Sequence, residues 1–161
     1  GNVTAGKFLK VDSVSGSGTT GIGTMTFADA GGSMASGFAN TDVNQTIQST
    51  SLTDLTNVTA SITPSSTSSK VLIVGRVQSQ SSNYGIGLGI VRDSTVIYED
   101  EGSHATYSGD SEYVVSPFSF IDSPSTTSST TYKVQVKTYG SASHTMQQGG
   151  DSNICLVEIL G

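Results

Sequence analysis

The densest group of ionisable side chains forms one acidic stretch near the middle of the chain. It opens with Glu99, Asp100 and Glu101 and ends with Asp110 and Glu112. Oxygen-rich loops can hold calcium, which takes about six to eight oxygen ligands. The ligand spacing of an EF-hand is absent, and adjacent carboxylates in a turn usually form a solvated tip. We therefore keep Glu99, Asp100 and Glu101 as weak metal candidates and expect no bound metal.

The same stretch could supply the acid pair of a glycoside hydrolase, which needs two carboxylates at a set separation. Glu99, Glu101 and Glu112 are the candidates, but spacing along a loop does not identify a pair. Trp, the usual platform for stacking sugars, does not occur in the chain. A polysaccharide-degrading enzyme is therefore the weakest of the functional hypotheses.

Three tyrosines near the acidic stretch favour a binding hypothesis instead. Tyr98, Tyr107 and Tyr113 carry rings that could stack on a saccharide. The alternative is that such rings fill strand faces and loop edges. A receptor- or carbohydrate-binding module, with a host glycan as partner, is thus a second hypothesis.

Nucleophilic and zinc chemistry find no support in the remaining reactive residues. His104 and His144 are far apart, and no Gly-x-Ser-x-Gly motif is present. Cys155 is the single cysteine and lies in the apolar run from Ile154 to Val157, which predicts a buried small hydrophobe. His144 is expected at a surface or interface, where it could tune assembly with pH. The sequence predicts no enzyme and no cofactor.

Composition bounds the class of protein. The chain has 161 residues, which suits one domain, and only 12% are charged. The first glutamate is Glu99, so strong helix formers are scarce and almost no helix is expected. Apolar residues alternate with Ser, Thr and Gly from about residue 44, which favours ordered strands over a flexible linker.

Charge and hydropathy exclude two classes of partner. The formal net charge is −6 and the seven basic residues are scattered, so no nucleic-acid partner is expected. No apolar stretch approaches the roughly 20 residues of a membrane span. A soluble protein without a membrane partner is expected.

The chain divides at about residue 43. Residues 1–43 are predicted to form an N-terminal arm, with strands at Lys7 to Val11 and Ile22 to Ala28 and a Gly/Ala/Ser-rich connector. Asp29 to Asn40 cannot build a core alone and is expected to lie along the domain or against a neighbouring copy. Residues 44–161 are predicted to form the β-sandwich domain.

Short strands separated by turns are predicted throughout this domain. About nine to ten strands without a crossover helix indicate an all-β, antiparallel sandwich of jelly-roll type. The predicted strands are Gln45–Thr50, Val58–Thr63, Lys70–Gln78, Tyr84–Arg92, Thr95–Glu99, Tyr113–Ile121, Tyr132–Tyr139, Thr145–Gln148 and Asn153–Leu160.

Two strands depart from the pattern of one dry and one wet face. Val71 to Val74 and Ile154 to Leu160 carry apolar residues on both faces, which implies that both faces are covered. In Tyr84 to Arg92, glycine alternates with apolar residues and leaves a bare backbone stripe at Gly85, Gly87 and Gly89. Such a stripe marks close approach by another group. A subunit interface is the predicted cover.

Three segments resemble a module that recurs in virion proteins of tailed phages, namely tail-fibre, tip and head-decoration proteins. They are Ile62–Ile73 (ITPSSTSSKVLI), Ile90–Asp93 (IVRD) and Asp122–Thr127 (DSPSTT). The resemblance covers roughly Gln45 to Leu160. The strand pattern is also similar to the jelly roll of trimeric tumour-necrosis-factor and complement-type head domains, whose apolar last strand lies near the threefold axis.

The resemblance implies a non-enzymatic virion structural protein on the particle surface, either a capsid decoration protein or a fibre or spike head. It implies a homotrimer whose partners are other capsid or tail proteins. The predicted interface residues are Phe8, Leu9, Val11, Gly85, Gly87, Gly89, Val157, Ile159 and Leu160.

Overall fold

The structure is a computed structural model that describes residues 7–15, 22–29, 33–39, 43–81, 85–100, 112–139 and 142–161. The chain forms two compact units, Gly1–Gly32 and Ser33–Gly161. Within the described ranges it contains strands and no helix, and therefore no helix that could cross a membrane.

The first unit is a two-stranded antiparallel hairpin. Its strands are β1 (Lys7–Ser15) and β2 (Ile22–Asp29), close to the predicted segments. The register shifts once, between Val11 and Ser13.

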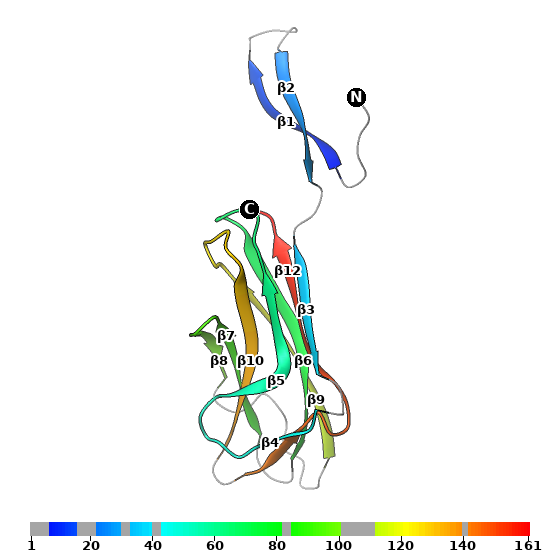
Figure 1. Ribbon diagram of the computed structural model, residues 1–161, viewed down its shortest axis with the longest axis vertical. Coiled ribbons are helices and arrows are strands. Elements are labelled where there is room, and N and C mark those ends of the chain that lie inside the picture. The colour runs from blue at the N-terminus through cyan, green and yellow to red at the C-terminus, as the bar shows by residue number, and fades with distance from the viewer. Residues whose placement is uncertain are drawn as a thin grey trace. The chain divides into compact units, whose positions relative to one another are not determined.

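The second unit is an antiparallel β-sandwich of two sheets, which confirms the predicted jelly-roll class (Figure 1). Its strands are β3 (Met34–Ala39), β4 (Gln45–Ile47), β5 (Thr53–Ile62), β6 (Lys70–Ser81), β7 (Ile86–Arg92), β8 (Thr95–Glu99), β9 (Glu112–Asp122), β10 (Thr130–Thr138), β11 (His144–Met146) and β12 (Ser152–Ile159).

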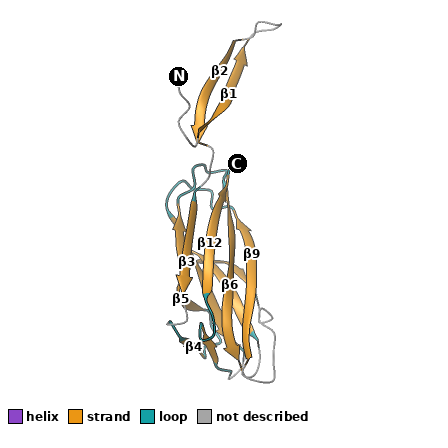
Figure 2. Ribbon diagram, turned by 90° about the vertical axis from the view of Figure 1, so that its right-hand side faces the viewer, coloured by secondary structure: helices purple, strands orange, loops and turns teal. Residues whose placement is uncertain are grey.

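Four strands form one sheet in the order β5-β10-β7-β8. The other sheet has six strands, in which β9 and β6 pair along their length. On the opposite edge of β6, β12 and then β11 pair with successive parts of the strand, and β3 and β4 lie beyond them. Figure 2 shows β3, β12, β6 and β9 side by side.

The core lies between the two sheets because each sheet turns every second residue inward. Tyr132 and Val134 of β10 are fully buried from one sheet, and Ile73 of β6 and Leu156 of β12 are fully buried from the other. The alternation of buried and half-buried positions along β10 is complete. The two-residue period of a strand therefore sets which residues of β10 face the core.

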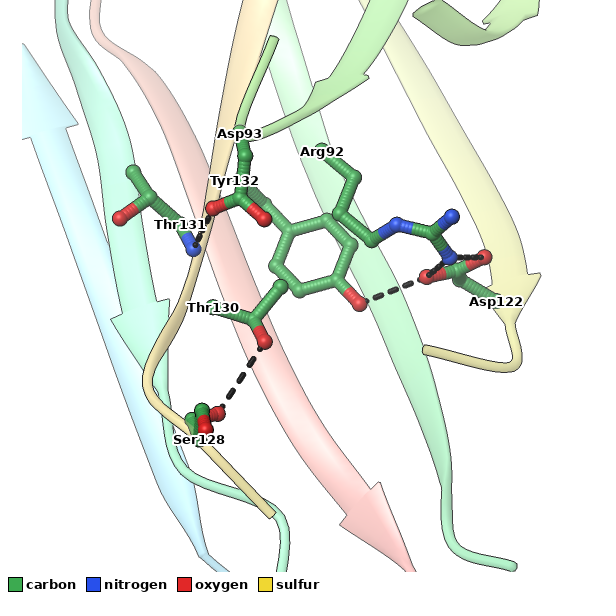
Figure 3. Close-up of polar contacts among 7 residues, drawn as sticks. All are labelled: Arg92, Asp93, Asp122, Ser128, Thr130, Thr131 and Tyr132. Carbon is green, nitrogen blue, oxygen red and sulfur yellow. Dashed lines mark hydrogen bonds and ion pairs between the residues drawn. The ribbon is translucent and has the colours of Figure 1, made fainter. Parts of the chain in front are cut away.

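A polar contact links the two sheets at the end of the sandwich where β7 turns into β8. Asp122 of β9 accepts a hydrogen bond of 2.7 Å from the Tyr132 hydroxyl of β10. The Arg92 guanidinium contacts both oxygens of the same carboxylate at 2.9 Å (Figure 3). Beside it, the Asp93 carboxylate accepts a hydrogen bond of 3.0 Å from the Thr131 amide. This arrangement is structural, since Tyr132 has no exposed surface.

The glycine stripe on β7 is covered by the chain itself. A Cβ atom at Gly89 would lie 2.8 Å from a methyl carbon of Leu52, and one at Gly87 would lie 2.8 Å from Cε of Lys137. Both glycines are buried in the single chain. The prediction that they contact another subunit is therefore corrected, because Leu52 and Lys137 occupy that space.

The segment before residue 43 contributes to the sandwich. Residues 34–39, which the sequence analysis assigned to the arm, form β3 and pair with β12. At Gly37 the Thr59 carbonyl of β5 occupies the place of a Cβ atom, so only glycine lets the two strands approach this closely. Residues 34–39 thus lie along the body of the domain, which is one of the two places predicted for this segment.

Candidate assembly interface

An apolar row crosses the outer face of the six-stranded sheet. The strand register places Met34 of β3 opposite Val157 of β12, Val157 opposite Leu72 of β6, and Leu72 opposite Ile121 of β9. Directly opposed residues of antiparallel strands share a face. These four residues, here called the apolar row, therefore form a continuous hydrophobic band across four strands.

The apolar row is open to solvent in the single chain. Met34 is 70% exposed and Ile121 is 54% exposed, while Val157 and Leu72 are half-buried by their neighbours. Val115 on the same face of β9 is 50% exposed. A contiguous exposed apolar surface of this kind marks an interaction site in a folded protein.

The next row along the same face is also uncharged. It consists of Ser36, Cys155, Val74 and Ser119, aligned by the same register. Met34, Ala35, Ser36 and Cys155 line a shallow hollow of about 140 Å³ between β3 and β12. Charge returns on both sides of these two rows, at Arg76, which lies 3.7 Å from Asp151, and at the exposed Lys70, which is opposite Ile159.

The outer face of the four-stranded sheet has the opposite character. Lys133 of β10 makes an ion pair of 2.7 Å with Asp54 of β5, and Lys137 makes one of 2.6 Å with Glu99 of β8. The Thr59 hydroxyl donates to the Tyr132 carbonyl at 3.1 Å. A sheet that faces water shows this polar pattern. The two outer faces of the sandwich therefore differ in character, one apolar and one ion-paired.

The free edge of β9 is protected against strand pairing. Among the described strands β9 pairs only with β6, and it carries Pro117 near its middle, opposite Arg76. Proline has no N–H to donate and is a common means of blocking an edge strand. A partner is therefore expected against the face of this sheet rather than along its edge.

Two of the predicted interface residues near the end of the chain lie on this surface. Val157 belongs to the apolar row, and Ile159 is the next residue of β12 on the same face. Leu160 is exposed but follows the end of β12. Gly85 lies before β7 and is half-buried. Phe8, Leu9 and Val11 belong to β1 of the hairpin.

The two described tyrosines of the glycan hypothesis are not brought together. Tyr98 packs against Phe120, with ring centroids 5.5 Å apart. Tyr113 is on β9, seven residues before Phe120, and seven residues span roughly 23 Å along a strand. The Tyr113 ring lies over Gly149. Tyr107 lies outside the described residues. The described tyrosines thus form no shared stacking platform.

The candidate metal ligands are engaged otherwise. Glu99 pairs with Lys137, and the Asp100 amide donates to the Leu88 carbonyl at 2.8 Å. Glu101 lies outside the described residues. Among the described residues no three His, Cys, Asp or Glu side chains gather into a possible metal site.

His144 requires a correction. It was expected at a surface or interface, but it has no exposed surface in the single chain, and neither ring nitrogen has a hydrogen-bond partner among the described residues. The register places it between Ile47 of β4 and Ser81 of β6. Burial lowers the pKa of the imidazole. A charged ring is disfavoured there, so His144 is a neutral core residue.

Glu158 is an important polar residue that sequence reasoning did not select. It is only 5% exposed, and its carboxylate accepts hydrogen bonds of 2.8 Å from the Ser33 amide and 2.6 Å from the Ser65 amide. Burial alone would raise the pKa of the Glu158 carboxyl, but these hydrogen bonds and that of the Ser65 hydroxyl lower it to about 2. Glu158 thereby fixes the start of β3.

Sequence and structure comparisons bear on the fold alone. No protein-family model matches the sequence, and no curated protein sequence matches it. The fold is similar to that of the Eiger TNF protein of S. frugiperda, with a TM-score of 0.53 and 11% identity over 81% of this chain and 94% of that one. The VP2 subviral particle of infectious bursal disease virus matches with a TM-score of 0.49 and 16% identity, over 83% of this chain and 35% of that one.

Proposed function

We propose that this chain is a non-enzymatic virion structural protein that acts by assembling into a homotrimer through the outer face of its six-stranded sheet. The observation that carries the proposal is the apolar row from Met34 to Ile121, set against the ion-paired outer face of the other sheet. A virion component acts through stable contacts, and no reaction chemistry is required of it.

The energetics favour a covered face. Burying a large apolar side chain contributes about 1.5–3 kcal/mol, and each subunit offers the four residues of the apolar row. Association costs several kcal/mol in lost rotational and translational freedom, which the flanking Val115, Val74 and Ile159 help to offset. The shared row, rather than any single residue, therefore supplies the affinity.

The proposed place in a virion is supported by the sequence. The segments 62–73, 90–93 and 122–127 resemble tailed-phage decoration and fibre modules. The trimer is supported by the similarity to the trimeric tumour-necrosis-factor jelly roll and by the apolar last strand, β12. The protein would lie on the particle surface, as a capsid decoration protein or a fibre or spike head, next to other capsid or tail proteins.

Size-exclusion chromatography with light scattering tests this function. The purified chain should have three times the mass of one chain, and Ile121→Asp should yield monomers with an unchanged circular dichroism spectrum, because residue 121 is exposed. Thr56→Asp, on the outer face of the four-stranded sheet, is the matched control and should leave the trimer intact. A monomeric wild-type protein would refute the proposal.

A further inference from the structure

Two very short strands hold one end of the six-stranded sheet (Figure 1). β4 and β11 have three residues each, and among the described strands β4 pairs only with β11. β11 ends beside Gln147, whose φ of 59° lies in the left-handed region that residues other than glycine rarely adopt. Elements with few pairings and a strained end belong to the parts of a protein that open locally while the rest stays folded. β4 and β11 are here called the short-strand end.

The short-strand end buries a histidine together with apolar side chains. His144 of β11 is in register with Ile47 of β4, and Met146 follows on the same face of β11. All three side chains are buried, and His144 has no exposed surface. Neither ring nitrogen of His144 has a hydrogen-bond partner among the described residues. A positive charge on this ring would therefore lie in a buried, apolar place without compensation, which is costly.

The charged residues of the neighbouring strands pair with one another rather than with His144. They are Asp54 with Lys133, Lys137 with Glu99, and Arg76 with Asp151. The positions of β4 and β6 in register with β11 are uncharged, being Gln45–Ile47 and Ser79–Ser81. Glu112 of β9 is in register with Ser81, so its position is two strands from His144, roughly 10 Å away. Burial therefore dominates at this ring, and it lowers the pKa of His144.

From these observations we infer that the short-strand end is an acid-sensitive switch: protonation of His144 opens β4 and β11 while the other strands of the sandwich stay folded. The open form exposes the ring to water, so it binds a proton more tightly than the closed form, and acid favours opening. If the ring titrates with its ordinary pKa of 6.5 when open and stays neutral when closed, the opening equilibrium increases about 30-fold at pH 5. Opening also exposes Ile47 and Met146, which are buried at neutral pH.

Amide hydrogen exchange of the full chain, measured by mass spectrometry at pH 7.5 and pH 5.0, tests this inference. After correction for the intrinsic pH dependence of exchange, protection of residues 45–47 and 144–146 should fall about 10- to 30-fold at pH 5.0. Protection of residues 71–77 and 153–158 should change by less than about twofold, because β6 and β12 keep their other pairings.

Three variants assign the effect to one side chain. His144→Leu should abolish the acid-dependent loss of protection in residues 45–47 and 144–146, because the side chain at 144 no longer titrates. His144→Gln is a second neutral variant and should behave in the same way, which keeps the test intact if His144→Leu does not fold. Glu112→Gln is the matched control and should retain the loss.

The outcomes separate a local switch from other effects of acid. An equal loss of protection in all four segments would mean that acid unfolds the whole sandwich, which overturns the local switch. Protection that does not change with pH, or that falls equally in the wild type and both His144 variants, overturns the role of His144. Loss of the acid effect in Glu112→Gln would overturn it as well. The mass of the oligomer does not enter this test, so its result is independent of the proposed trimer.

Discussion

Tyr132 of β10 donates a hydrogen bond of 2.7 Å from its hydroxyl to the carboxylate of Asp122 of β9, so the two sheets are bonded through a buried pair. Burial and the neighbouring carboxylate raise the pKa of the Tyr132 hydroxyl far above its ordinary value. The hydroxyl therefore remains a donor throughout the normal pH range, and Arg92 balances the charge of Asp122.

Tyr132→Phe should lower the free energy of unfolding by about 1–3 kcal/mol, because Asp122 loses one of its donors in a buried site. Urea unfolding measures the change. Tyr139→Phe is the control, since Tyr139 is exposed, and it should change the free energy of unfolding by less than about 0.5 kcal/mol. Equal effects of the two substitutions would show that the hydrogen bond contributes nothing.

Glu158→Gln should destabilise the sandwich by about 2 kcal/mol at neutral pH, because hydrogen bonds to a charged acceptor are lost. The folded pKa of about 2 lies below the ordinary value of 4.5, so this stabilisation is present above pH 4.5 and declines as the pH falls toward 2. The wild type and the variant should therefore converge in acid. If the difference in unfolding free energy between the wild type and Glu158→Gln stays constant from neutral pH to about pH 3, the ionised Glu158 carboxylate is not the source of this stabilisation.

His144→Leu should keep or raise stability at neutral pH, because a buried ring with no hydrogen-bond partner among the described residues is replaced by an apolar side chain. Burial lowers the pKa of His144, so below about pH 6.5 the unfolded chain binds a proton that the folded chain does not. Wild-type stability should fall between about pH 7 and pH 5. In thermal unfolding, the stability of the His144→Leu variant should lack this part of the pH dependence. If stability changes with pH equally in the variant and the wild type, His144 does not cause the loss of stability in acid.

Gly89→Ala should cost about 1–3 kcal/mol, because its Cβ would meet two methyl carbons of Leu52 at 2.8 and 2.9 Å. Leu52→Ala removes those atoms, so the same glycine substitution should cost less in that background, as a double-mutant cycle would measure. Gly75→Ala should be worse than Gly89→Ala, since its Cβ would meet the Asn153 carbonyl of the backbone. If the changes in unfolding free energy caused by Gly89→Ala and Leu52→Ala are strictly additive, contact with Leu52 is not the reason that Gly89→Ala is destabilising.

Only part of this fold was predictable from periodicity. β8 coincides with its predicted range, whereas β5 begins at Thr53, five residues before the predicted Val58. Asn57 has a φ of 63°, and the register with β10 shifts in this region. A bulge breaks the two-residue alternation on which the prediction depends.

By itself, the sequence determined the class of fold. Alternating apolar and Ser/Thr residues, with scarce helix formers, leave an antiparallel sandwich as the way to bury the apolar half of each strand. It also showed that Val71 to Val74 and Ile154 to Leu160 carry apolar residues on both faces. These properties are local, so the order of residues along a strand is enough to reveal them.

Only the tertiary structure decided which surfaces remain for a partner. Met34, Leu72, Ile121 and Val157 come from four distant segments, and cross-strand register alone aligns them into the apolar row. Pairing of β11 with β4 and β6 buries His144, and packing brings Leu52 over Gly89 and Lys137 over Gly87, two of the glycines predicted to face a partner. Periodicity says that a residue lies on a face, but what covers that face depends on contacts between residues far apart in the chain.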